Sequence, residues 1–262
     1  MKSDAAMAPA GISRLDLLLV SYLKQALRQP GCPLCRVIRD ADLYYLKVFL
    51  REGKDDGRML LRLLASWGLC ARHADGLVHL EPVERGDGLG TGTLYDWLLD
   101  YARRRLEDLR QSLQAGDDPG TPRRRRILRR YFGRIISRLA QTARCAACEA
   151  QRQYAAYVTT EFARALEIAK VLPEIRNMYL ASEGLCLPHW RAVEQSLPSP
   201  DTRALVGEKQ HTMIASLKAA LEAELACGAG EEVRLGSVGE APAYARALAT
   251  VAGATEWQRS AR

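Results

Sequence analysis

The sequence lacks the long apolar runs that mark membrane proteins. No apolar stretch of its 262 residues approaches the ~20 residues that a membrane-spanning helix requires. The best candidate, Leu15 to Leu23, is short and ends at Lys24. The first residues also lack the continuous apolar core and small-residue cleavage site of a secretory signal peptide. We therefore expect a cytoplasmic protein without a transmembrane helix.

The sequence also lacks the short motifs of common enzymes. It contains no G-x-S-x-G nucleophile elbow, no dinucleotide fingerprint, no phosphate-binding loop and no H-E-x-x-H motif. The Gly-rich stretch from Gly86 to Gly92 lacks the Lys-Ser/Thr ending of a phosphate-binding loop, and we expect it to form an ordinary loop. The acidic residues Asp40 and Asp42 are expected on a helix surface. These absences favour a protein that is not an enzyme.

Two cysteine motifs each occur twice along the chain. The first half contains Cys32-Pro-Leu-Cys35 and later Gly68-Leu69-Cys70-Ala71-Arg72-His73, and the second half contains Cys145-Ala-Ala-Cys148 and later Gly184-Leu185-Cys186-Leu187-Pro188-His189. An offset of 113 residues carries the first C-x2-C block onto the second, and an offset of 116 carries the first GLC-x2-H block onto the second. Such matches in register predict an internal duplication.

The composition predicts an all-α fold. Aromatic residues make up only 6% of the chain, and Ala, Leu and Arg predominate over the residues that strands prefer. We expect two tandem, pseudo-symmetric repeats of about five helices each, packed together. The predicted organisation is a disordered N-terminus at 1–12, a first helical repeat at 13–115, a linker at 116–121, a second helical repeat at 122–227 and a loosely ordered tail at 228–262. One helix is expected in the tail, near Ala241 to Val251.

The duplicated motifs supply the ligand types of a metal site. Zinc is bound tetrahedrally by Cys thiolates and neutral His, and each half contains three such cysteines and one histidine. We expect one quartet in each half. These quartets are Cys32, Cys35, Cys70 and His73 in the first half, and Cys145, Cys148, Cys186 and His189 in the second. Four protein ligands leave no position for water or substrate, so the expected role of the two metal ions is structural.

The same cysteines leave an alternative open. Cys-rich sites also bind iron–sulfur clusters, and C-x2-C is the spacing of thiol redox pairs. The histidine in each quartet favours two zinc ions, and an iron–sulfur or thiol redox protein is the alternative. The chain contains seven cysteines, and Cys227 has no counterpart in the first half.

Positive charge is concentrated in one segment. The whole chain has a formal net charge of +7, whereas residues 101–140 contain twelve Arg and four acidic residues, a local +8. The arginines most relevant to a polyanionic partner are Arg123, Arg124, Arg125, Arg126, Arg129 and Arg130. Nucleic acid would be attracted to this segment, so a nucleic-acid-binding regulator is a second alternative. No helix-turn-helix, RNA-binding motif or C2H2 finger accompanies the segment.

At the Cys-Pro-Leu-Cys and Gly-Leu-Cys-x-x-His blocks, the chain resembles an uncharacterised bacterial family, a domain of unknown function that carries this motif twice. The resemblance covers about Ser13 to Ala226. It implies a bacterial, soluble, all-helical protein, and it implies no reaction or partner. The functional hypothesis therefore depends on the residues themselves. They indicate a metal-binding helical protein that presents a binding surface to an unknown partner.

Overall fold

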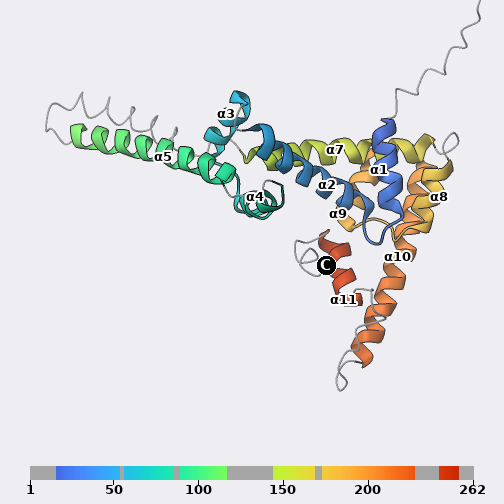
Figure 1. Cartoon of the computed structure of the whole chain (residues 1–262). Helices are drawn as coiled ribbons and strands as arrows, with labels where there is room; N and C mark the ends of the chain where they lie inside the picture. The colour runs from blue at the N-terminus through green and yellow to red at the C-terminus, as the bar shows by residue number, and fades with distance from the viewer. Residues whose placement is uncertain are drawn as a thin grey trace, which may run out of the picture. The chain divides into compact units, whose positions relative to one another are not determined.

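The computed structural model describes residues 16–53, 56–84, 89–116, 144–168, 173–227 and 242–253 (Figure 1). All regular structure in these ranges is helical, which confirms the all-α expectation for this part of the chain. The expected N-terminal segment 1–12 lies outside the described residues, as do the expected linker after Gly116 and the tail apart from 242–253.

The described ranges contain helices from both halves of the chain. In the first part of the chain they are α1 (Leu17–Leu27), α2 (Pro33–Val48), the π-helical turn η1 (Phe49–Gly53), α3 (Gly57–Ser66), α4 (Ala71–Glu84) and α5 (Leu89–Gly116). Later come α7 (Ala146–Glu167), α8 (Pro173–Ala181), α9 (Leu187–Ser196), α10 (Pro200–Cys227) and α11 (Ala243–Ala252). The last of these, α11, confirms the helix expected in the tail.

The loop expected from Gly86 to Gly92 is wrong in its second part, because α5 begins at Leu89. The buried carboxylate of Glu81 accepts hydrogen bonds from the backbone N–H of Thr91, at 2.8 and 3.0 Å. This contact satisfies one of the free N–H groups at the start of a helix. It therefore offsets the low helix propensity of the glycines in the first turn.

The chain divides into two compact units. Unit 1 comprises Met1–Asp40 and Tyr154–Arg262, and unit 2 comprises Ala41–Gln153. The boundaries fall inside α2 and α7, so each unit combines residues from both halves of the sequence. That the two halves form equivalent structural repeats stays a prediction.

The core of unit 1 is built from the apolar faces of its helices. Asp16 caps α1, because its Oδ1 accepts hydrogen bonds from the N–H groups of Leu18 and Leu19 at 3.0 and 3.2 Å. The rings of Phe162 on α7 and Tyr179 on α8 pack in a T-shaped arrangement, with centroids 5.7 Å apart. Buried residues of α1, α2, α7, α8, α9 and α10 complete this core, among them Leu23, Leu34, Val158, Leu166, Ile175, Val193 and Val206.

A separate cluster forms the core of unit 2. It consists of Leu46, Phe49, Leu50, Leu63, Leu77, Leu94, Cys145 and Ala147. Two of these residues belong to the second C-x2-C motif, so this core lies directly against the cysteines. No described helix combines the length and the apolar character needed to cross a membrane.

We expect Phe162→Ala to lower the free energy of unfolding by about 3–5 kcal/mol, because it removes a fully buried aromatic ring and leaves a cavity beside Tyr179. Urea-induced unfolding measures this change. The control is Leu18→Ala, at a side chain that is 74% exposed, for which we expect a change within about 0.5 kcal/mol. Equal losses from the two variants would contradict the described core.

Candidate metal centres

The eight predicted ligands gather into two quartets. Site 1 consists of Cys32, Cys35, Cys186 and His189, and site 2 consists of Cys70, His73, Cys145 and Cys148. Within each site, the ligand atoms all lie within 4.8 Å of one another. The expected grouping within each half of the sequence is therefore wrong: each site takes its C-x2-C pair from one half and its C-x2-H pair from the other. Site 1 lies in unit 1 and site 2 in unit 2.

The length of α2 explains this exchange. Cys32 and Cys35 lie at the beginning of α2, whereas the ring of His73 contacts Asp42, ten residues after Cys32. Because an α-helix rises about 1.5 Å per residue, this contact lies about 15 Å along the helix from Cys32. The C-x2-H motif of the first half is thus out of reach of its own C-x2-C motif. It meets the cysteines at the beginning of α7 instead.

Every ligand pair lies at the start of a helix. The first cysteine of each motif precedes the helix, and its carbonyl oxygen accepts a hydrogen bond from the first turn. These bonds join Cys32 to Arg36, Cys70 to Ala74, Cys145 to Glu149 and Cys186 to Trp190, at 3.3, 2.9, 3.0 and 2.8 Å. The second ligand follows three residues later, in the same turn. The free N–H groups and the positive end of each helix dipole stabilise thiolates there.

The loops that carry the ligands of site 1 are held by side chains of unit 1. The carboxylate of Glu183 accepts a hydrogen bond from the N–H of Gly31 at 2.7 Å, which joins the loop before Cys186 to the loop before Cys32. The amide of the buried Gln210 binds both backbone groups of Leu185, at 3.3 Å to the N–H and 2.8 Å to the carbonyl. The two loops are therefore positioned before any metal binds.

In site 1, one imidazole nitrogen faces all three sulfurs. His189 Nδ1 lies 3.5 Å from Cys32 Sγ, 3.3 Å from Cys35 Sγ and 3.1 Å from Cys186 Sγ. The sulfurs of Cys35 and Cys186 are 3.6 Å apart. This separation is far longer than the ~2.05 Å of a disulfide bond, so no disulfide joins these two cysteines.

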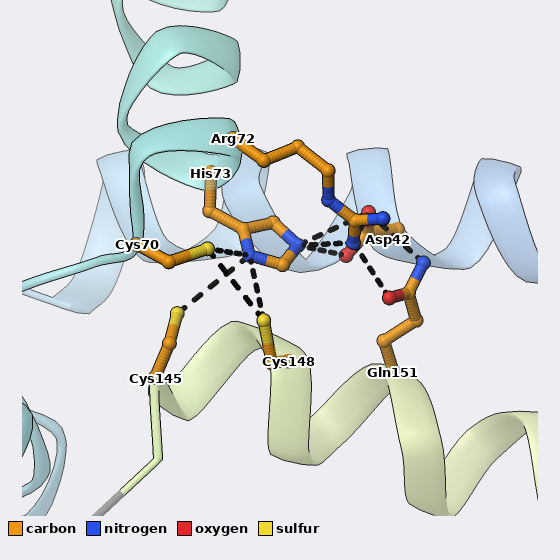
Figure 2. Close-up of polar contacts among 7 residues, drawn as sticks. All are labelled: Asp42, Cys70, Arg72, His73, Cys145, Cys148 and Gln151. Atoms are coloured by element: carbon orange, nitrogen blue, oxygen red, sulfur yellow. Dashed lines mark hydrogen bonds and ion pairs between the residues drawn. The ribbon is translucent and has the colours of Figure 1, made fainter. Parts of the chain in front are cut away.

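Site 2 repeats this arrangement. His73 Nδ1 lies 3.2 Å from Cys70 Sγ, 3.6 Å from Cys145 Sγ and 3.4 Å from Cys148 Sγ. The sulfurs of Cys70 and Cys148 are 3.6 Å apart. Figure 2 shows the ring of His73, at the start of α4, with its Nδ1 directed at the cysteines of α7. Each site thus offers three sulfurs and one nitrogen to a common centre.

A second set of side chains contacts His73 at Nε2, the ring nitrogen that faces away from the cysteines. Its Nε2 lies 3.0 and 3.2 Å from the two carboxylate oxygens of Asp42 (Figure 2). Asp42 Oδ2 in turn accepts hydrogen bonds from Arg72 Nη2 and Gln151 Nε2, both at 3.3 Å. Arg72 Nη2 also donates to Gln151 Oε1 at 2.6 Å. The expectation that Asp42 is an ordinary surface residue is wrong, because it is only 8% exposed.

One feature of the sequence could have revealed Asp42. Leu34, Ile38 and Leu46 are buried at four- and eight-residue spacings along α2, and Asp42 occupies the remaining position of that row. An acidic residue inside an apolar row must have a buried partner, because an unpaired buried charge is costly. Nothing in the spacing indicates that Arg72 and Gln151 join it.

The histidines bind protons tightly when no metal is present. Burial lowers the pKa of His73, but hydrogen bonds to Asp42 and to the sulfur of Cys145 outweigh it and raise the pKa to about 10. Burial likewise opposes the charge on His189, and contacts with Cys186 and Cys35 raise its pKa to about 10. In both sites the contacts of the imidazole with neighbouring acceptors therefore favour its protonated form.

The cysteines of site 2 differ in proton affinity. Burial raises the pKa of Cys145, but hydrogen bonds from His73 and from backbone N–H groups prevail and lower it to about 6. Burial and the neighbouring sulfurs raise the pKa of Cys148 to about 12. A dication at the centre would replace the protons that this site holds, because thiolates and neutral imidazole are the ligand forms that bind metal.

The end of α11 lies close to site 1. Gly253 follows α11 with a φ of +85°, and a Cβ added there would lie 3.8 Å from the sulfurs of both Cys35 and Cys186. Glu224 on α10 accepts hydrogen bonds from the N–H groups of Ala243 and Tyr244, which fixes the other end of α11. The backbone of Gly253 therefore covers one side of the sulfurs.

Comparison with known families places these sites in a larger group. A family described as a family of unknown function, DUF6062, matches residues 23–225. The chain belongs to DUF6062. The match includes all eight ligands and ends before α11. No curated protein and no solved structure matches the chain. Membership of DUF6062 confirms the family resemblance, and a bacterial source stays a prediction.

The remaining predicted residues cannot be placed at these centres. The arginines proposed to attract nucleic acid, Arg123 to Arg126 with Arg129 and Arg130, lie outside the described residues. Cys227 is the last residue of α10.

The grouping of the ligands can be tested with paired substitutions. In the C32S/C186S variant both changes fall in site 1, so we expect about one metal ion per chain to remain, at site 2. In the C32S/C70S variant each site loses a thiolate, and we expect both ions to be lost. Elemental analysis of purified protein measures the metal content.

Circular dichroism of the same samples, together with the reciprocal C70S/C148S variant, controls for loss of folding. Retention of one ion by C32S/C70S and of none by C32S/C186S would restore the grouping within each half.

Metal binding should release protons. At pH 7 the imidazoles of His73 and His189, with pKa values of about 10, hold a proton that the ion must displace. Raising the pH removes this competitor, so the apparent affinity should rise about tenfold per pH unit for each proton released. Calorimetric titration with zinc, in buffers of different ionisation enthalpy, measures the release. An affinity that does not change between pH 6 and pH 8 would contradict this expectation.

Proposed function

We propose that this DUF6062 protein is a non-enzymatic zinc protein of the cytoplasm. It holds two structural zinc ions, one in each Cys3His site, and presents its helical surface to a partner. The proposal depends on one observation, the arrangement of three sulfurs and one nitrogen around a single point in each site.

The distances between the ligand atoms favour zinc. With Zn–S bonds of about 2.3 Å and Zn–N bonds of about 2.0–2.1 Å, a tetrahedral ion separates two sulfurs by about 3.8 Å and a sulfur from a nitrogen by about 3.6 Å. The sulfur–sulfur distance of 3.6 Å in the Cys35–Cys186 and Cys70–Cys148 pairs and the sulfur–nitrogen distances of 3.1 to 3.6 Å are close to these values, and all ligand atoms of a site lie within 4.8 Å of one another.

The same distances weigh against the iron–sulfur alternative. A cluster spreads its protein ligands over two or more iron atoms, so the ligand atoms lie farther apart than around a single ion. The thiol redox alternative needs a pair of cysteines that can form a disulfide. In both sites, however, a third cysteine and a histidine share the centre with the C-x2-C pair.

The chemistry of the donors supports a structural role. Four protein ligands complete the tetrahedron, so no position remains for a water molecule or a substrate. Each ion would connect two helix starts that are far apart in sequence, at Cys32 and Cys186 in site 1 and at Cys70 and Cys145 in site 2. Because metal binding of this kind adds its free energy to folding, removal of the ions should destabilise the helices around them.

We expect protein purified without oxygen to be colourless and to contain about two zinc ions per chain. Elemental analysis and a visible spectrum measure both properties. Replacing zinc with cobalt should give the intense sulfur-to-metal absorption and the visible bands of a tetrahedral site. A brown protein with bound iron and sulfide would show that the cluster alternative is correct. A chain without bound metal, with all eight side chains intact, would contradict the zinc proposal.

A further inference from the structure

The two sites differ in how their histidines are held. When Nδ1 of an imidazole binds a metal ion, the ring is neutral and its proton is on Nε2. In site 2 this Nε2–H points at Asp42, with 3.0 Å to Oδ1 and 3.2 Å to Oδ2 (Figure 2). A carboxylate in this position fixes the ring orientation and makes the imidazole a stronger ligand.

Asp42 is itself fixed by two further side chains. Arg72 and Gln151 both donate to its Oδ2, and they are joined to each other by a 2.6 Å hydrogen bond. Arg72 Nη2 also lies 2.8 Å from His73 Nε2. When His73 binds a metal through Nδ1, its Nε2 carries the proton. This Nε2–H donates a hydrogen bond to Asp42, and the Arg72 guanidinium pairs with the Asp42 carboxylate. The support of His73 thus comes from α2, α4 and α7 together.

In the described part of the chain, site 1 has no equivalent of this support. The offsets that relate the two halves carry Asp42 to Ala155, Arg72 to Pro188 and Gln151 back to Ile38, so that apolar side chains stand at all three positions. All hydrogen bonds of His189 run from Nδ1 to sulfur, and among the described residues none reaches its Nε2. Among the described residues, the sulfurs are the hydrogen-bonding partners that hold the ring of His189.

From this difference we propose that the two sites hold zinc unequally, with Asp42 as the positioning residue that makes site 2 the tighter site. Site 2 keeps its ion as a permanent part of the fold. Site 1 is the weaker site and loses its ion first as the free zinc concentration falls. This inference rests on the proposed function, because it presupposes that both sites bind zinc.

The proximity of Gly253 to the sulfurs of site 1 decides which measurement is suitable. A covering backbone slows the approach of a chelator to Cys35 and Cys186, whatever the strength of binding. Release rates would therefore combine access with affinity. Equilibrium competition reports affinity alone, because both sites then reach the same free zinc concentration.

The experiment titrates the full-length, zinc-loaded protein with a chromophoric zinc chelator until each point is at equilibrium. We expect two steps, with the first ion leaving at a free zinc concentration 10- to 100-fold higher than the second, the range typical of a lost outer hydrogen bond to a metal ligand. The C32S/C186S variant should retain only the tight step, and C70S/C148S only the weak step. These variants assign each step to its site.

The decisive variants change Asp42. Asp42→Ala should weaken the tight step 10- to 100-fold and merge it with the weak one, whereas Asp42→Asn should weaken it less, because an amide oxygen still accepts the Nε2–H bond. The matched control is Asp40→Asn, two residues earlier on α2, where the carboxylate is 62% exposed and pairs with Arg39. This variant should leave both steps unchanged.

A readout independent of stability is the Nε2–H proton itself. In the zinc-loaded protein, nitrogen-detected NMR should show one slowly exchanging imidazole N–H, from His73, and Asp42→Ala should abolish it while the circular dichroism spectrum is retained. A single step in the wild type, or two unchanged steps in Asp42→Ala, would overturn the proposal while leaving two zinc ions per chain. A wild-type protein that binds no zinc would instead contradict the proposed function, and it would therefore contradict this inference as well.

Discussion

The described structure depends on helix starts that meet in pairs. Each site brings together two first turns, and each turn contributes one ligand just before the helix and a second three residues later. Three sulfurs within 4.8 Å of one another repel when they carry charge. The positive ends of the helices offset part of this repulsion, and a dication at the centre would offset the rest. The positions of the helix starts and the electrostatics of the ligands are therefore linked.

The exchange of motifs between the halves makes the sites long-range contacts. Ligands of site 1 are separated by 151 to 157 positions in sequence, and those of site 2 by as many as 78. Closing such loops costs chain entropy before any ligand contact is gained. Side-chain contacts reduce this cost in unit 1, where Glu183 joins the two ligand loops and Gln210 holds the loop before Cys186.

The sequence predicts the ligands better than their grouping. The helices and the eight ligand residues follow from local patterns, because the spacing within each motif fits one helical turn. Whether Cys70 shares a site with Cys32 or with Cys145 depends on how α2 and α7 are placed in the fold. A local sequence pattern does not determine that placement. The contact between Asp42 and His73 is not predicted by the sequence for a related reason. Asp42 stands out as an acidic residue in an apolar row, but its partners Arg72 and Gln151 come from two other helices.

The crossed ligand sets also bear on how such a chain could arise. In a chain with a single copy of each motif and this placement of His73 beside α2, the C-x2-H motif would lie about 15 Å along the helix from the C-x2-C motif. Two such molecules could complete both quartets if the C-x2-C pair of each bound beside the histidine of the other. A head-to-tail fusion of that symmetric dimer would yield a monomer with two metal centres, joined as they are in this chain.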